Sequence, residues 1–230
     1  MPTIVISGAN RGLGLEFARQ YAADGARVHA GARDPAGATA LNEAAGESGG
    51  RLTVHALDVA DAQSVKAFAA AVGGAPVDLV IANAGVFGGD RQHRLGAIDY
   101  DQFAETLAVN AIAPLRLADA FAANLRAAKG KFIAITSGMG SIEDGGSGYL
   151  AYRSSKAALN MICRVLANDL RPDGVFAAPM SPGWAKTDMG GPSAPQEVAP
   201  TVAAMRRRIE KLTLADSGKF LDWDGGEVAW

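Results

Sequence analysis

The chain has 230 residues, of which 49% are hydrophobic and 20% charged, and its formal net charge is −2. This balance is typical of a soluble globular protein, and the near-neutral charge argues against nucleic acid as a partner because polyanion binding requires a basic surface. No basic leader precedes the first apolar segment, and no apolar run reaches membrane-spanning length. We therefore expect a cytoplasmic protein without a membrane partner.

Short apolar segments alternate with amphipathic helical patterns along the chain. Strands are predicted at 3–7, 27–32, 52–57, 77–82, 131–136, 175–180 and 219–221. Helices are predicted at about 13–24, 36–46, 61–73, 101–128, 150–170 and 196–211. The alternation predicts one α/β domain over residues 1–230, with a Rossmann-type, doubly wound parallel sheet of about seven strands and helices on both faces. A substrate loop is expected at about 188–215, because the stretch 188–200 is rich in glycine and proline; this stretch suits a mobile lid and equally a plain connector.

The turn between the first strand and the first helix reads S-G-A-N-R-G-L-G, with glycines at 8, 12 and 14. Glycines let the backbone approach a pyrophosphate, and the following helix offers free N–H groups, although an ordinary tight turn would also use glycine. The second strand ends in Ala32 and Arg33 where NAD-binding enzymes commonly have an acid, and Arg11 lies inside the turn. Unless both arginines are simply exposed, they favour NADP(H) over NAD(H) because a guanidinium binds a 2′-phosphate.

Tyr152 and Lys156 stand four positions apart in Y-R-S-S-K, which puts both side chains on one face of a helix. A free tyrosine has a pKa near ~10, and a neighbouring ammonium lowers it by stabilising the phenolate. Such a pair suits general acid–base catalysis at a carbonyl or alcohol. Taken alone, a pair of this spacing is more often an ordinary surface contact.

Further motifs follow the other strands in order. They are Asp58-Val59, Asn83-Ala84-Gly85 (with Ala82 before it), Asn110, Ser137, and Pro182-Gly183 with Thr187. Together with the glycine turn and the tyrosine–lysine pair, they make nearly the whole chain resemble the short-chain dehydrogenase/reductase family. The resemblance implies cofactor contacts at Gly8, Asn10, Arg11, Gly12, Leu13, Gly14, Arg33, Asp58, Val59, Asn83, Ala84, Gly85, Tyr152, Lys156, Pro182, Gly183, Trp184 and Thr187.

The same resemblance implies four catalytic roles. Tyr152 would give its proton to the carbonyl oxygen, Lys156 would lower the pKa of Tyr152 and bind the nicotinamide ribose, and Ser137 would hydrogen-bond the same oxygen. Asn110 would hold a water that links Lys156 to solvent. Ser137 lies fifteen positions before Tyr152 rather than the usual thirteen, and Ser141 is a rival that lies past the strand end.

Several longer stretches resemble the carbonyl-reductase branch of the family, which includes the sniffer and C-factor-like proteins. They are A-N-R-G-L-G-L-E, the segment from G-S-I-E-D through the tyrosine–lysine pair, P-G-W-A-K-T-D-M-G-G, and the C-terminal F-L-D-W-D-G-G-E-V-A-W. This branch implies reduction of an aldehyde or ketone with NADPH. Residues flanking the motifs are candidate substrate-pocket walls, or alternatively core: Phe87, Met139, Ile142, Tyr149, Trp184 and Met189.

Other classes of site and function remain to be weighed. His29, His55 and His93 are not expected to cluster, so no catalytic metal is predicted. The helices at 101–128 and 150–170 carry broad apolar faces. The family resemblance implies that these faces pack against their copies in a homodimer; the alternative is burial within one chain. The alternatives to a carbonyl reductase are a dinucleotide-binding signalling or regulatory protein and an NAD-linked alcohol dehydrogenase.

Overall fold

The computed structural model describes residues 1–88 and 95–230, and their strands form one parallel sheet in the order β3-β2-β1-β4-β5-β6-β7. The strand order reverses between β1 and β4, as it does in doubly wound sheets, so the predicted fold class is confirmed. The strands are β1 (Thr3–Ser7), β2 (Arg27–Ala32), β3 (Leu52–Ala56), β4 (Leu79–Ala82), β5 (Lys131–Ile135), β6 (Phe176–Ser181) and β7 (Leu221–Asp222).

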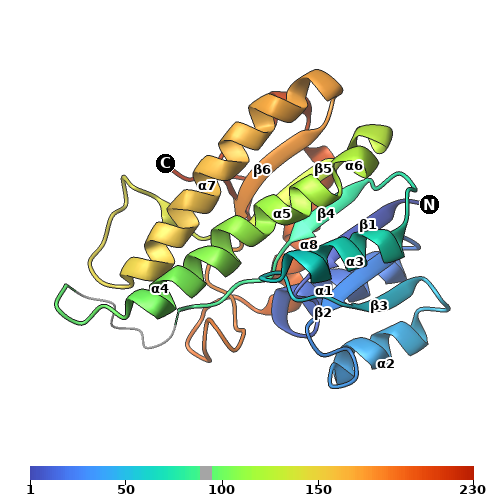
Figure 1. Ribbon diagram of the computed structural model, residues 1–230, viewed down its shortest axis with the longest axis horizontal. Coiled ribbons are helices and arrows are strands. Elements are labelled where there is room, and N and C mark those ends of the chain that lie inside the picture. Colours follow the sequence, from blue (N-terminus) through green and yellow to red (C-terminus); the bar gives the residue numbers. More distant parts are fainter. Residues whose placement is uncertain (89–94) are drawn as a thin grey trace.

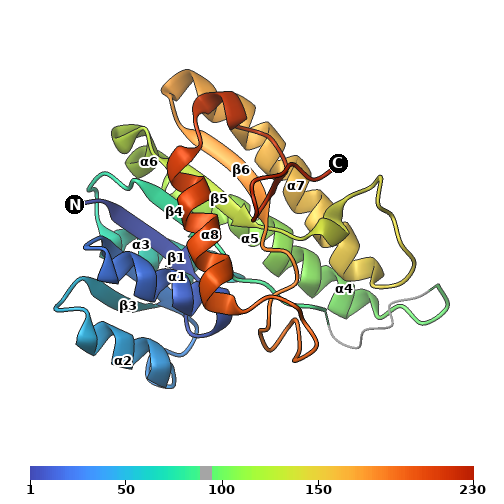
Figure 2. The ribbon, with the colours of Figure 1, turned by 180° about the vertical axis from the view of Figure 1, so that it is seen from behind.

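Helices cover both faces of the sheet. Figure 2 shows one face covered by α1 (Gly12–Ala23), α2 (Thr39–Glu47) and α8 (Val198–Lys211). Figure 1 shows the opposite face, covered by α3 (Ala62–Val72), α4 (Tyr100–Leu107), α5 (Ala113–Ala120), α6 (Ala122–Ala128) and α7 (Leu150–Leu170). Each face of the sheet has its own apolar core, and successive side chains of one strand point to opposite faces. On β1, Ile4 and Ile6 belong to the core under α1 and α8, and Val5 belongs to the core on the opposite face.

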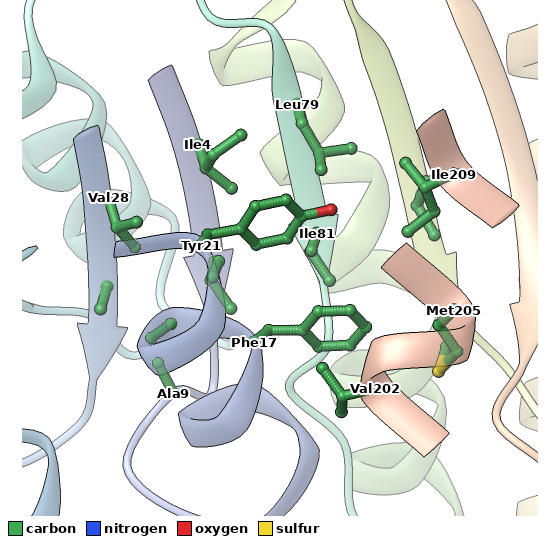
Figure 3. Close-up of a cluster of buried hydrophobic side chains, with 14 of the residues drawn as sticks. Ile4, Ala9, Phe17, Tyr21, Val28, Leu79, Ile81, Val202, Met205 and Ile209 are labelled. Carbon is green, nitrogen blue, oxygen red and sulfur yellow. The ribbon is translucent and has the colours of Figure 1, made fainter. Parts of the chain in front are cut away.

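The helix α8 belongs to the core rather than to a substrate loop. Phe17 of α1 packs with Val202 and Met205 of α8 over the β-strands (Figure 3), and all three side chains are fully buried. The helix predicted at about 196–211 is confirmed, and it occupies most of the region 188–215 in which a substrate loop was expected. Only the part before Val198 connects β6 to this helix without regular helical structure.

The helix predicted over 101–128 is interrupted twice. Between α4 and α5 the chain forms a π-helical segment, η1 (Ala108–Ile112), which contains Asn110. The pair Tyr100–Ala120 and Ala122–Ala128 is bent by 59° at Phe121, which is fully buried in the core. A π-helical turn inserts an extra residue per turn and commonly marks a functional position. In the described part of the chain, no single helix is long and apolar enough to cross a membrane, although this bent pair passes by length and composition.

Two histidines meet on the outer strands of the sheet. Nδ1 of His29 on β2 lies 3.0 Å from Nε2 of His55 on β3, and the His55 ring contacts Phe68 of α3 edge-on. The prediction that the histidines do not cluster was wrong for this pair, because neighbouring parallel strands place them on the same face; His93 lies outside the described residues. Burial lowers the pKa of His29 to about 4. No group of three or more metal-ligating side chains occurs among residues 1–88 and 95–230.

Candidate active site

A cleft of about 1430 Å³ runs across the carboxyl ends of the strands, where doubly wound sheets bind their ligands. The loops after β1 to β6 line it, and they bring most of the predicted site residues together. These are Gly8, Asn10, Arg11, Gly12, Leu13, Arg33, Asp58, Val59, Asn83, Ala84, Gly85, Phe87, Ser137, Met139, Tyr149, Tyr152, Lys156, Pro182, Gly183, Trp184, Thr187 and Met189. Gly14, Asn110 and Ile142 do not line the cleft.

The glycine turn has no room for side chains at two of its positions. A Cβ on Gly14 would stand 2.2 Å from the carbonyl oxygen of Gly8, and one on Gly8 would stand 2.8 Å from the Cα of Ala84. Asn83 fixes the turn from the neighbouring strand, because its Nδ2 donates to the carbonyl oxygens of Ser7 and Gly8 at 3.1 and 2.9 Å. Gly14 and Asn83 thus shape the cradle in which the first turn of α1 presents its N–H groups.

The first turn of α1 is suited to an anion. No side chain caps it at Arg11, and no acidic residue lies in it. Uncapped N–H groups and the positive end of the helix dipole both favour a bound phosphate. The residues present therefore fit the pyrophosphate of a dinucleotide.

The two arginines predicted to bind a 2′-phosphate differ in their partners. Arg33 is exposed at the end of β2 and, within the part of the chain that the structure describes, forms no ion pair. Arg11 also lies at the cleft, but its Nη1 pairs with Oδ2 of Asp188 at 2.5 Å, across from the glycine turn. This partner was not anticipated from the sequence.

Lys156 is buried beneath the cleft floor. Its Nζ donates to the carbonyl oxygen of Ile135 at 2.9 Å, at the end of β5. Burial lowers the pKa of Lys156 to about 8 because an ammonium loses solvation there. A Cβ on Gly85 would stand 3.7 Å from this nitrogen and 3.2 Å from Oδ1 of Asn110, so the absence of a side chain at Gly85 leaves the space between the two open.

Asn110 is held by the loop that follows β4. Its Oδ1 accepts from the Val86 N–H, and its Nδ2 donates to the Val86 carbonyl oxygen, both at 2.8 Å. The same Nδ2 donates to Oγ of Ser155 at 3.0 Å. The side-chain oxygen and nitrogen of Asn110 therefore both have hydrogen-bond partners. The role of holding a water, expected from the sequence, would fall to other atoms than those of this side-chain amide. What the geometry gives Asn110 is a positioning role, because it ties the π-helical segment to β4 and α7.

Tyr152 lies at the cleft surface above Lys156, whose Nζ is 5.6 Å from the centre of the tyrosine ring. Phe87 stacks on that ring at 4.7 Å between centroids. Burial raises the pKa of Tyr152 to about 12, while a hydrogen bond with the Ser137 hydroxyl opposes the rise. The sequence suggested a pKa lowered by Lys156; without a bound cofactor, burial dominates instead.

The far end of the cleft is apolar and aromatic. Tyr149 adopts the left-handed conformation, at φ 55°, and its ring packs edge-on against Phe87. Met189 approaches Tyr152, with 4.0 Å between its sulfur and the phenol oxygen. Ile142, by contrast, is 78% exposed and does not line the cleft, so its place in a pocket wall stays a prediction. A loop residue with no neighbour to cover it cannot be assigned to a wall from sequence position.

Sequence reasoning missed several residues that support the site. Ser141, considered as a rival catalytic serine, instead donates to the main-chain oxygen of Trp230 at 3.3 Å, and the same oxygen accepts from the Glu143 N–H. Val228 of the same C-terminal segment lines the cleft. Thr136 donates to Asn160 and so links β5 to α7 beneath Lys156. None of these carries a local motif, since each acts through a contact distant in sequence.

Comparison with known proteins decides the family. The model of the short chain dehydrogenase family matches residues 2–198, which is most of the chain. The chain belongs to the short-chain dehydrogenase family. The C-signal protein of Myxococcus xanthus is 44% identical over 170 residues, which cover 72% of this chain and 100% of that protein.

Solved carbonyl reductases share the fold of this short-chain dehydrogenase over its full length. The NADPH-bound carbonyl reductase from chicken fatty liver is 36% identical with a TM-score of 0.93, over 100% of this chain and 99% of that one. Carbonyl reductase Sniffer of D. melanogaster is 28% identical with a TM-score of 0.93, and both chains are covered completely. The predicted family and its likeness to carbonyl reductases are confirmed.

The buried ammonium makes a prediction about stability. Because its pKa falls from 10.5 to about 8, Lys156 holds fewer protons in the folded than in the unfolded protein between those values. Burying the charged ammonium therefore lowers the free energy of unfolding of the wild type. This destabilisation is fully present below pH 8 and disappears as pH rises to 10.5, at about 1.4 kcal/mol per pH unit. The free energy of unfolding of Lys156→Met, relative to the wild type, is therefore expected to fall over that range.

Urea unfolding of both proteins at pH 7.5 and pH 10 measures this difference. Loss of the Lys156–Ile135 hydrogen bond shifts the variant by the same amount at both pH values, so only the change with pH is diagnostic. Lys66→Met removes an exposed ammonium from α3 and serves as the control. A Lys156→Met advantage that stayed constant or grew with pH would contradict the stated cost of burial.

Proposed function

We propose that this short-chain dehydrogenase reduces an aldehyde or ketone to the alcohol with NADPH, and that Tyr152 is the general acid. The observation that carries the proposal is the placement of Tyr152 over buried Lys156 at one end of a cleft whose other end is built for phosphates. Carbonyl reductases among the similar structures, one of them NADPH-bound, support it.

The choice of NADPH rests on the basic side chains at the adenosine end. Ala32 ends β2 without an acid, and the exposed Arg33 follows it directly. Arg11 supplies a second guanidinium at the same cleft. The 2′-phosphate of NADPH accepts charge-assisted hydrogen bonds from guanidinium groups, whereas NADH has only an uncharged 2′-hydroxyl at that position.

Chemistry at the other end follows from the protonation of Tyr152. When bound, NADPH would supply a hydride to the carbonyl carbon. The Tyr152 phenol holds its proton at neutral pH and lies at the cleft, where it can donate that proton to the carbonyl oxygen as charge develops there. Ser137, which hydrogen-bonds Tyr152, can stabilise the same oxygen.

A dinucleotide-binding signalling protein is the alternative, and the likeness to the C-signal protein gives it a basis. A sensor would need the phosphate-binding end of the cleft alone. The buried Lys156 and the positioned Tyr152 and Ser137 would then be an unexplained cost, because burying an ammonium destabilises a fold. The enzyme is therefore the better-supported function.

Replacing the phenol tests the catalytic proposal. Tyr152→Phe is expected to lower carbonyl-dependent NADPH oxidation by about 10²- to 10⁴-fold, the usual contribution of a general acid, while NADPH binding persists. Tyr149→Phe removes the other phenol hydroxyl among the described residues that line the cleft and is the matched control, with turnover expected within a fewfold of the wild type. Turnover retained by Tyr152→Phe would refute its assignment.

The second proposal under this function is a homodimer through α5 and α7. Figure 1 shows these helices beside each other on the face with α4. Ile112, which ends η1, and Leu115 of α5 are 45% and 40% exposed, and Met161 and Val165 of α7 are 63% and 48% exposed. Exposed large apolar side chains on neighbouring elements are typical of a protein interface.

A dimer would elute with twice the 23.6-kDa mass of the chain. Val165→Glu introduces a charge on this face, away from the cleft, and is expected to shift the protein to the monomer because burying an unpaired carboxylate is costly. Light scattering during size-exclusion chromatography at micromolar concentration measures both masses. A monomeric wild type would rule out the dimer.

A further inference from the structure

Two contacts hold the loop after β6 against the glycine turn. The Arg11 guanidinium pairs with the Asp188 carboxylate at 2.5 Å, although the two residues are 177 positions apart. One residue earlier, the Thr187 methyl lies 3.3 Å from the position of a Cβ on Gly12. The charged contact thus joins the side of the cleft that receives phosphates to the side that carries substrate-wall residues.

The Arg11–Asp188 ion pair connects two different parts of the cleft. Lys186 and Glu197 form another pair, but both belong to the segment between β6 and α8. Among the ion pairs of residues 1–88 and 95–230, the Arg11–Asp188 pair is the one that joins the glycine turn to this segment. The side chains of Arg11 and Asp188 are 68% and 71% exposed, so the contact is weak and open to exchange.

We propose that Asp188 is a specificity-determining residue that competes with the 2′-phosphate of NADPH for Arg11. The inference rests on the proposed use of NADPH and adds a residue that opposes its binding. A phosphate group carries more charge than a carboxylate and accepts more hydrogen bonds, so it displaces Asp188 from a guanidinium in this solvent-exposed position. NADH, which has a 2′-hydroxyl instead, leaves the ion pair intact.

Exchange of Asp188 for the 2′-phosphate at Arg11 affects the substrate end of the cleft through Met189. Met189 follows Asp188 directly, and its sulfur lies 4.0 Å from the Tyr152 hydroxyl. In the same loop Nε1 of Trp184 donates to the Gly190 carbonyl oxygen at 2.8 Å. Capture of Arg11 by the phosphate therefore removes one of the contacts that hold this segment, which carries two predicted pocket walls. By linkage, a ligand that favours the segment without this contact strengthens NADPH binding.

Equilibrium binding of both cofactors to the full chain tests the competition without relying on turnover. Asp188→Asn removes the competing charge and keeps the shape of the side chain. At low ionic strength its dissociation constant for NADPH is expected to fall about two- to fivefold, the range of an exposed ion pair. The dissociation constant for NADH is expected to change less, because only NADPH recruits Arg11 to its 2′-phosphate.

Glu197→Gln is the matched control, since it removes the same charge from the same loop but from the Lys186 pair. It is expected to leave the NADPH-to-NADH preference unchanged. In an Arg11→Gln background, Asp188→Asn is expected to affect both cofactors equally. Equal tightening of both cofactors by Asp188→Asn alone, or no tightening of NADPH, would overturn the competition.

The Arg11→Gln single variant separates this inference from the proposal beneath it. If it loses NADPH preference while Asp188→Asn has no effect, only the competition fails. If it keeps full NADPH preference, the role of Arg11 in phosphate recognition fails and the competition fails with it. Carbonyl reduction itself is measured separately, by the turnover of the wild type.

Discussion

The arrangement of the cleft around Tyr152 depends on burial of one ammonium group, that of Lys156. Lys156 sits under the cleft floor with Ile135 of β5 as its hydrogen-bond acceptor. This requires α7 to lie with its Tyr152–Lys156 face against the ends of β4 and β5, and Gly85 to leave space between Lys156 and Asn110. The hydrogen bonds of Asn110 to Val86 and Ser155 brace that arrangement from the π-helical segment. Burial of the ammonium destabilises the fold, and it occurs where the ammonium lies next to the Tyr152 phenol.

The two ends of the cleft are built by different physical means. At the phosphate end, backbone N–H groups and glycines do the shaping, and charge is supplied by exposed arginines. At the Tyr152 end, the phenol ring stacks on Phe87, and burial raises the pKa of Tyr152. The loop after β6 touches both ends, with Asp188 at one and Met189 at the other. That loop is therefore where cofactor recognition and substrate binding can influence each other.

Local patterns were enough to predict the strands, their parallel arrangement and most of the cleft, because a doubly wound sheet brings the strand ends together at one edge. Contacts distant in sequence were not predictable in the same way. The Arg11–Asp188 pair, the His29–His55 contact and the Ser141–Trp230 hydrogen bond each depend on loop or strand placement.

Two further differences arise from competition between local and tertiary preferences. The alanine-rich pattern of 101–128 is uniformly helical, and the interruption at 108–112 coincides with hydrogen bonds of Asn110 to another loop. Likewise the periodicity of Lys156 and Tyr152 shows that they share a face but not that this face is buried, and burial sets both pKa values. Desolvation is a property of the packed molecule, which spacing alone does not reveal.

The most direct test of NADPH-dependent carbonyl reduction is a fluorescence titration of the wild type with NADPH and NADH, followed by NADPH oxidation with a panel of aldehydes and ketones. The account predicts tighter binding of NADPH than of NADH and oxidation that depends on the added carbonyl compound. Tighter binding of NADH would contradict the role given to Arg33 and Arg11. Tight NADPH binding without turnover on any member of a broad panel would contradict the enzyme and favour the sensor.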